Sequence, residues 1–581
     1  MRKLCTAIFL GCLKISLFAQ PTFPVNGVAD QRETLYAFKN ATIVQDAQHV
    51  LNNATLLIRH DKIVGVGTNI AIPSEAIVLD CSGKFIYPSF IDLYADYGMA
   101  APSMQGGGGR NAYLNVQLNS NAKGAFGWNQ AIKADVNAGS LFVVDDTKAK
   151  ALRDAGFGAV LAHQKDGIAR GTGAFVSLAN VKENFAIIKE KASAHYSFSK
   201  GSSQQSYPSS MMGSITLLRQ TYYDAIWYKN NASKEGVNLS LIAWNNIQSL
   251  PQVFEANDKW NVLRADRIGD EFGVQYIIKT GGNEYQRINE IASTGASLIV
   301  PVNYPMAMDV EDPTDARFVS LSDMKHWELA PTNPASLEKS GITFSLTTAD
   351  LRSPNAFMAN LRKAIEYGLS ETKALEALTT NPAKMIGVTD AVGSIEQGKL
   401  ANFIITTGNV FNEKSSIVEN WIQGKKYSVK SEKWSDVAGS YTIQVSGDKG
   451  NKSFSLQVKS SSAASIISTD TIATKFSHDG KLVKISFPAE KKSPNTIKLS
   501  GMINGDVWNG YGEDNEGNKY TWTATNNSLT AAQADTTKKK GPSKLGAVTY
   551  PFTPYGWTEA PKQEDRKSTR LNSSHEWISR M

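Results

Sequence analysis

The sequence predicts an α/β fold followed by an antiparallel β-domain, and two kinds of pattern support this prediction. Between residues 87 and 394, helical patterns alternate with short apolar runs, as they do where helices connect the strands of a sheet. Between residues 431 and 527, the pattern changes to strands in which apolar and polar residues alternate. The chain of 581 residues is therefore expected to contain more than one folded unit.

Residues 1–19 are expected to be a secretory signal peptide. Arg2 and Lys3 precede a short apolar stretch, and Ala19 provides a small residue at the cleavage position. Lys14 interrupts the apolar stretch and excludes a transmembrane helix of about 20 residues. We therefore expect an exported bacterial protein, periplasmic or secreted, with no transmembrane segment.

The cysteines are consistent with export without disulfides. Cys12 follows Gly11 as in a lipoprotein signal, but the apolar run before it is short, so lipid anchoring is not favoured. Cleavage after Ala19 would leave Cys81 as the remaining cysteine, which excludes an intramolecular disulfide in the mature chain.

The first part of the mature chain is expected to be β-structure. Residues 39–44 and 54–67 alternate apolar and polar positions, with a hairpin turn at His60-Asp61. The alternating region that follows includes strand-like runs at 296–300 and 342–346 and helical patterns at 336–339 and 360–369.

Two motifs frame this region. The first is Pro88-Ser89-Phe90-Ile91-Asp92-Leu93-Tyr94-Ala95-Asp96, and the second comprises residues 377–387 with 393–403. Together they resemble the opening and closing signatures of the amidohydrolase superfamily, particularly its imidazolonepropionase-like members. The resemblance implies a (β/α)8 TIM-type barrel over 87–394, with a composite β-domain made from residues 20–86 and 395–430.

The resemblance also implies metal-ligand positions, most of which have changed residue type here. The family opening has the form P-G-F-I-D-x-H-x-H, and Tyr94 and Asp96 stand in the two histidine places. Glu255 falls at the fifth-strand histidine position. Thr280 falls at the sixth-strand histidine position, with Lys279 as an alternative.

Asp350 is the candidate that keeps the family residue type, because the eighth strand of the family supplies an aspartate that binds metal and deprotonates water. Such barrels place working residues at the carboxyl ends of their strands. Asp350 follows the strand-like run at 342–346 at a short distance. The resemblance therefore implies the role of catalytic base for Asp350, and the fourth-strand ligand has no counterpart that we can identify.

The substituted residues do not suit the family chemistry. Catalytic zinc takes imidazole and carboxylate ligands and lowers the pKa of its bound water to about 7. A tyrosine phenol has a pKa near 10, and it would have to ionise first. No cofactor is therefore expected in this copy, although Asp96, Asp350 and Glu255 could form a different site for a hard, oxygen-loving ion.

The histidines support the same conclusion. The chain has 7, and no two lie within four residues of each other, so short metal-binding spacings are absent. Lone histidines are expected to be surface or satisfied structural residues. His163 and His326 lie in segments that could reach the barrel mouth, although neither matches a family ligand position.

The C-terminal region from 431 to 527 is expected to be a β-sandwich or barrel. Trp508 and Trp522 could be exposed for carbohydrate binding, but core packing is the favoured interpretation. Residues 528–564 are rich in Ala, Thr, Lys, Pro and Gly and are expected to be a linker.

Residues 565–581 begin with a sequence that resembles the in-frame translation of a short-read sequencing adapter, which indicates an artefact. The natural reading frame is then expected to continue beyond Glu564. Without the +3 of the signal peptide and the +2 of the adapter segment, the net charge falls from +7 to +2. This balance gives no reason to expect a nucleic-acid or anionic-membrane partner.

Three functions remain open from the sequence. The leading hypothesis is a catalytically impaired amidohydrolase copy, the first of a tandem pair, which serves as scaffold for a missing C-terminal hydrolase half. The family activity is metal-dependent hydrolysis of C–N bonds, such as cyclic or other non-peptide amides or dipeptides. The alternatives are an active hydrolase with a carboxylate metal site and Asp350 as base, or a module that binds peptides, small amides or glycans.

Overall fold

The computed structural model describes residues 35–102, 118–120, 122–308, 317–430, 439–447, 450–460, 463–467, 471–479, 482–489, 493–504 and 507–527. The expected signal peptide, Cys12, the linker at 528–564 and the adapter-like segment at 565–581 lie outside the described residues. Within the described part of the chain, no helix is long and apolar enough to cross a membrane.

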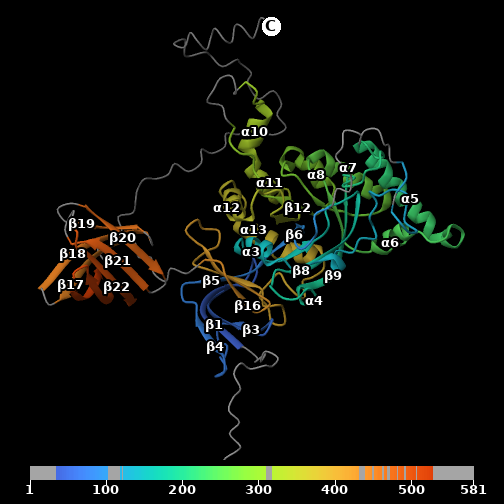
Figure 1. Ribbon diagram of the computed structural model, residues 1–581. Coiled ribbons are helices and arrows are strands. Elements are labelled where there is room, and N and C mark those ends of the chain that lie inside the picture. The colour runs from blue at the N-terminus through green and yellow to red at the C-terminus, as the bar shows by residue number, and fades with distance from the viewer. Residues whose placement is uncertain are drawn as a thin grey trace, which may run out of the picture.

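An eight-stranded sheet combines strands from both flanks of the central barrel region (Figure 1). Its strands are β1 (Leu35–Val44), β2 (Val50–Arg59), β3 (Lys62–Gly67), β4 (Ile77–Asp80), β5 (Phe85–Pro88), β14 (Phe403–Thr406), β15 (Ile417–Ile422) and β16 (Lys425–Ser428). The β2–β3 hairpin turns at His60, whose φ of 53° suits a tight turn. β14 pairs with β5, so residues more than 300 positions apart share one sheet. Edge-to-face packing of Phe38 on Phe403 and on Trp421 fills its core.

A second eight-stranded sheet forms the central barrel, in the order β13-β12-β11-β10-β9-β8-β7-β6. Its strands are β6 (Phe90–Ala95), β7 (Phe157–Ala162), β8 (Ala169–Ser177), β9 (Ile187–Ser197), β10 (Gln252–Glu255), β11 (Ile277–Lys279), β12 (Leu298–Pro301) and β13 (Phe344–Thr347). β8 runs antiparallel to both neighbours, which corrects the expectation of a uniform (β/α)8 barrel. The remaining neighbours in this sheet pair in parallel.

Asp92 joins the first and last strands where the ladder does not close. This buried carboxylate accepts hydrogen bonds from the Thr347 hydroxyl at 2.6 Å and from the Thr348 amide and hydroxyl at 2.8 and 2.6 Å. The barrel is thus nearly closed, with a polar contact between β6 and β13 in place of a backbone ladder.

Helices cover the barrel sheet, and polar caps fix where several of them begin (Figure 1). The Asp258 side chain, for example, accepts the Trp260 and Asn261 backbone N–H groups in the first turn of α7. The helices are α2 (Ala138–Leu141), α3 (Asp146–Asp154), α4 (Glu183–Ala186), α5 (Met211–Glu235), α6 (Leu239–Ile247), α7 (Lys259–Phe272), α8 (Ile288–Ser293), α10 (Leu321–Leu329), α11 (Asn333–Lys339), α12 (Phe357–Glu366), α13 (Glu371–Leu378) and α14 (Thr380–Met385). Short 3-10 turns lie at η1 (Glu284–Arg287), η2 (Ala330–Thr332) and η3 (Pro354–Ala356). α11 and α12 contain or overlap the helical patterns expected at 336–339 and 360–369.

The C-terminal domain is a closed barrel of antiparallel strands in which β24 pairs back with β17. Its strands are β17 (Gly439–Gly447), β18 (Gly450–Ser460), β19 (Ala463–Ile467), β20 (Thr471–Asp479), β21 (Leu482–Pro488), β22 (Thr496–Asn504), β23 (Val507–Asp514) and β24 (Lys519–Asn526). Trp508 and Trp522 are both buried in its core. This burial excludes the interpretation that these tryptophans are exposed for carbohydrate binding.

Candidate active site at the barrel mouth

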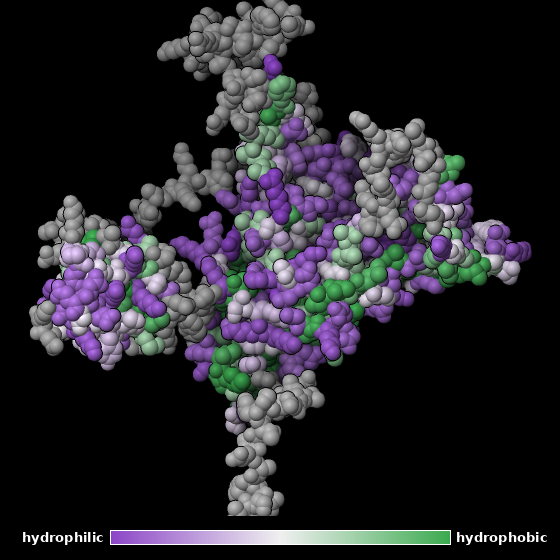
Figure 2. Space-filling view, viewed as in Figure 1, coloured by the Kyte–Doolittle hydropathy of each residue, from purple (hydrophilic) through white to green (hydrophobic). Residues whose placement is uncertain are grey.

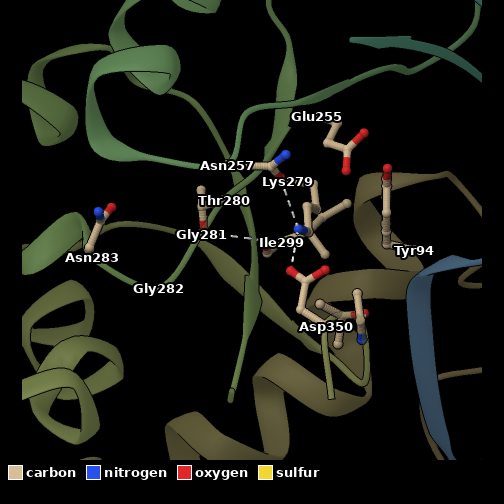
Figure 3. Close-up of polar contacts among 12 residues, drawn as sticks. Tyr94, Glu255, Asn257, Lys279, Thr280, Gly281, Gly282, Asn283, Ile299 and Asp350 are labelled. Carbon is tan, nitrogen blue, oxygen red and sulfur yellow. Dashed lines mark hydrogen bonds and ion pairs between the residues drawn. The ribbon is translucent and has the colours of Figure 1, made fainter. Parts of the chain in front are cut away.

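The carboxyl ends of four barrel strands bring the main site candidates together. Tyr94 lies near the end of β6, Glu255 ends β10, Lys279 ends β11, and Asp350 follows β13. Glu255 and Lys279 are direct neighbours across the β10–β11 ladder. Figure 3 shows the Lys279 ammonium against Asp350, with Glu255 and Tyr94 on the adjoining side of the mouth.

Arg170 forms the first ion pair of the site. Its guanidinium lies 2.5 Å from a Glu255 carboxylate oxygen and donates to the Tyr94 hydroxyl at 2.8 Å. A third bond, to the Gly167 carbonyl at 3.1 Å, fixes the plane of the group. All three side chains are largely withdrawn from water, since Arg170 is buried and Glu255 is only partly exposed.

Burial and charge act in opposite directions on these groups. Burial raises the pKa of Tyr94, an effect that the Arg170 charge only partly offsets, so the phenol remains protonated. Burial also raises the pKa of Glu255, but the charges of Arg170 and Lys279 outweigh it and the net pKa is lowered. Glu255 is therefore a carboxylate held by cations, and Tyr94 is a neutral hydroxyl.

Lys279 forms the second ion pair. Its ammonium lies 2.5 Å from Asp350 and 3.2 Å from the Asn257 side-chain oxygen. The Lys279 side chain is 0% exposed, whereas that of Asp350 is 48% exposed. Asp350 has a φ of 66°, a left-handed conformation that non-glycine residues adopt rarely, and this local strain accompanies a carboxylate directed at the lysine.

The other two candidates from the sequence do not join these pairs. The Thr280 hydroxyl is buried and donates to the Ile299 carbonyl at 3.4 Å, on the neighbouring strand. Asp96 is exposed beyond the end of β6. Of the two residues considered for the sixth-strand position, Lys279 is thus the one whose functional group faces Asp350.

Two histidines that are remote in sequence meet inside the barrel. His163 follows β7 and His195 lies on β9, and their rings stack with centroids 3.7 Å apart and planes 7° from parallel. Tyr94 packs on His163 at 4.7 Å. His195 Nε2 shares a hydrogen bond with the Ser193 hydroxyl at 2.8 Å, but its Nδ1 and both ring nitrogens of His163 are buried without a hydrogen-bond partner.

Both histidines are held in the neutral form. Burial lowers the pKa of each well below its usual value, and the nearby charges of Arg170 and Lys165 lower it further. These residues contradict the expectation that the histidines are surface or satisfied groups. His326 does satisfy that expectation, since its Nδ1 pairs with the Tyr285 hydroxyl at 2.9 Å.

The residues at the mouth do not fit the divalent metal that the fold family implies. Glu255 and Asp350 are each occupied by a fixed cation, and Tyr94 is protonated. The His163 and His195 rings lie in nearly parallel planes, whereas the ligands of a tetrahedral ion point toward it from different directions. Among the described residues, no group of three or more His, Cys, Asp or Glu side chains could hold a metal, so the oxygen-ligand site considered from the sequence does not form.

Arg170 and the His163–His195 pair were missed at the sequence level. Arg170 stands in a run of small residues that becomes the buried strand β8, and a charged residue in such a strand signals a buried partner. The histidines carry no comparable signal, because 31 intervening residues separate them and only the fold of β7 to β9 brings them into contact.

Comparison with known proteins agrees with this fold. A family model described as the amidohydrolase family matches residues 332–429. An amidohydrolase from Thermotoga maritima MSB8 superposes with a TM-score of 0.54 at 24% identity, covering 68% of this chain and 100% of that one. A prolidase complexed with N-methylphosphonate-L-proline has a TM-score of 0.42 at 14% identity, and the match covers 68% of this chain and 100% of that one. A β-aspartyl dipeptidase from Fervidobacterium islandicum-AW-1 has a TM-score of 0.38 at 15% identity, and the match covers 68% of this chain and 97% of that one.

A search of curated proteins finds no match. The fold is that of a barrel with a composite β-domain, and the closing segment carries the family match. The chain therefore resembles the amidohydrolase family in this closing segment, and its fold resembles that of the Thermotoga maritima amidohydrolase.

Proposed function

We propose that residues 35–430 form an amidohydrolase copy that has lost metal-dependent catalysis. One observation supports this proposal above the others: Arg170 and Lys279 are ion-paired with Glu255 and Asp350, the carboxylates that a metal or its activated water would need.

The charges make the loss hard to reverse by a simple side-chain rotation. A divalent ion about 4 Å from a fixed cation would be repelled by about 8 kcal/mol at an effective dielectric constant of about 20. Two such cations, Arg170 and Lys279, are anchored by further bonds to Gly167 and Asn257. A metal would therefore have to compete with both of them for the same oxygen atoms.

The scaffold role belongs to the same proposal. It rests on the resemblance to tandem exported amidohydrolases, in which a degenerate copy accompanies a metal-competent one. On this view the unit is exported, needs no cofactor of its own, and associates with a hydrolase half that acts on C–N bonds. Co-expression with the downstream reading frame of the source gene, followed by size-exclusion chromatography, tests the association directly.

Metal content is the first prediction to test. We expect elemental mass spectrometry of the protein, purified without chelator and exposed to Zn²⁺ before desalting, to find far less than one equivalent of transition metal. Asp350→Ala and Glu255→Ala should leave this low value unchanged. One equivalent in the wild type, lost in either variant, would support the active hydrolase with Asp350 as base and contradict the proposal.

A binding role is the second candidate, and the three unpartnered histidine nitrogens favour it. Buried polar atoms in native proteins almost always have a partner, so His163 Nδ1, His163 Nε2 and His195 Nδ1 indicate a polar guest such as water or a small amide. Thermal-shift titration with dipeptides and cyclic amides tests this role. Stabilisation without turnover would favour binding, and turnover without added metal would contradict both candidates.

A further inference from the structure

The outer surface of the β17–β24 barrel carries a hollow of about 660 Å³ that the proposed function does not use. Two rows of outward side chains from β20 to β24 run across it, as the strand register shows. The first row is Ser477, Lys484, Ser500, Tyr511 and Thr521, and the second is Lys475, Ser486, Lys498, Glu513 and Lys519. All but Thr521 line the hollow.

Successive side chains along each strand point to opposite faces of the barrel wall, and this alternation produces the two outward rows. Phe476, Ile485 and Leu499 lie between the outward residues and point into the buried barrel core. The lysines on the same strands therefore face solvent, and each is exposed. Figure 2 shows that hydrophilic residues dominate the visible face of this barrel.

The charge of the hollow is unbalanced. Four lysines line it, at positions 475, 484, 498 and 519, and Glu513 is the acidic residue among them. Among the described residues, no ion pair within 4.0 Å joins any of these lysines to an acid. Like charges on adjoining strands repel one another, so the arrangement is favourable mainly when an anion lies between them.

We propose that this strip binds an acidic polysaccharide, one whose sugars carry carboxylate or sulfate groups. The lysines supply mobile point charges that adapt to irregular anion spacing, while the hydroxyls of Ser477, Ser486 and Ser500 can bond to sugar hydroxyls. The Tyr511 ring is 77% exposed and offers a flat face for stacking against a sugar ring.

The dimensions suit an extended polymer. Five strands separated by about 4.8 Å give a strip about 19 Å long, and residues two apart on a strand place the rows about 7 Å apart. The surface is thus long and narrow, which fits one polymer chain spanning several sugar units.

Other polyanions fit less well. Single-stranded nucleic acid is bound by several aromatic platforms, whereas Tyr511 is the one exposed aromatic ring among the lining residues of the hollow. An acidic protein partner would be expected to contact an apolar interface centre, and the large apolar residues that line the hollow, Phe476, Ile485 and Leu499, are buried.

The experiment uses the full chain and isothermal titration calorimetry at low ionic strength. The probes are polygalacturonate, dextran sulfate, neutral dextran and single-stranded oligo-dT. We expect binding to at least one of the two acidic glycans and none to neutral dextran. The double variant Lys484→Gln/Lys498→Gln should bind about tenfold more weakly. Tyr511→Ala should weaken binding too, without a change in its salt dependence.

The matched control is Lys452→Gln/Lys459→Gln, which removes the same charge from exposed positions on β18. It should change affinity by less than about twofold. Circular dichroism of all variants checks that the barrel remains folded. Equal loss in the control, equal or tighter binding of oligo-dT, or no binding to either acidic glycan would each overturn the proposal. The choice between the two acidic glycans identifies the anionic group.

Discussion

The barrel mouth and the outer face of the C-terminal barrel both contain several cations. The cations differ in their burial and in whether a carboxylate lies beside them. In the mouth, Arg170 and Lys279 are buried, and each has a carboxylate at 2.5 Å. On the outer face, the lysines from β20 to β22 and β24 are exposed, and no described acid lies within ion-pair distance of them.

The difference separates two uses of the same charge. A buried cation must be compensated within the fold, because removing one partner of a buried pair leaves a desolvated charge. An exposed cation is compensated by water, so an unpaired cluster persists and remains available for a ligand. The cations of the mouth are therefore neutralised within the protein. The lysines of the outer face are solvated and remain available to a ligand.

Arg170→Met is expected to have the largest effect on stability. The substitution leaves Glu255 partly buried and the Tyr94 hydroxyl without its donor. We expect the free energy of unfolding, measured by urea denaturation, to fall by about 3–5 kcal/mol. Adding Glu255→Gln should recover a substantial part of that loss, since the unpaired charge is then removed.

The matched control for this prediction is Arg219→Met. Arg219 also lies 2.5 Å from a glutamate, Glu271, but this pair is at the surface, with side chains 44% and 26% exposed. It should cost less than about 1 kcal/mol. If the two substitutions had equal effects, burial would not distinguish the mouth from an ordinary surface ion pair.

The sequence predicts more of the fold than of the candidate site. The hairpin turning at His60 and the strands of the C-terminal barrel follow from alternating patterns, which depend on local spacing. The resemblance to amidohydrolases followed from the two framing motifs, and the amidohydrolase family model matches the region of the second motif, at 332–429. The antiparallel direction of β8 did not follow, because side-chain alternation is the same for either strand direction.

The site depends on long-range pairing that local patterns do not encode. Glu255 and Asp350 were candidates from the resemblance, but their partners Arg170 and Lys279 come from other strands. Lys279 was considered only as a ligand alternative, although a lysine within an apolar strand already indicates a buried partner. The ion pairs Arg170–Glu255 and Lys279–Asp350 therefore become visible only in the three-dimensional structure.

Acid should destabilise the mouth through its neutral histidines. His163 and His195 have pKa values lowered mainly by burial, so the unfolded chain binds more protons than the folded one below pH 6.5. Their contribution is complete above that pH and is lost as the pH falls. From pH 7.5 to 5.5 we expect a loss on the order of 1 kcal/mol for each histidine.

Urea denaturation across that pH range checks this prediction. His163→Leu removes one titrating group, and it breaks no hydrogen bond, because both ring nitrogens are unpartnered. The variant should lose about half of the pH dependence that the wild type shows in this range, even if its stability at neutral pH also changes. An unchanged pH dependence would mean that His163 gains its proton over the same pH range in the folded and the unfolded chain, contrary to a pKa lowered by burial.

The smallest expected effect concerns the outer face. Lys484 and Lys498 lie on neighbouring strands, diagonally placed around Ser486 and Ser500, and both are exposed. Replacing both with Gln should change the free energy of unfolding by less than about 0.5 kcal/mol, with a slight gain because like-charge repulsion is relieved. About 0.5 M NaCl should erase that gain by screening the repulsion in the wild type. A loss above about 1 kcal/mol would show that these lysines support the barrel itself, and the contrast with the paired cations of the mouth would then fail.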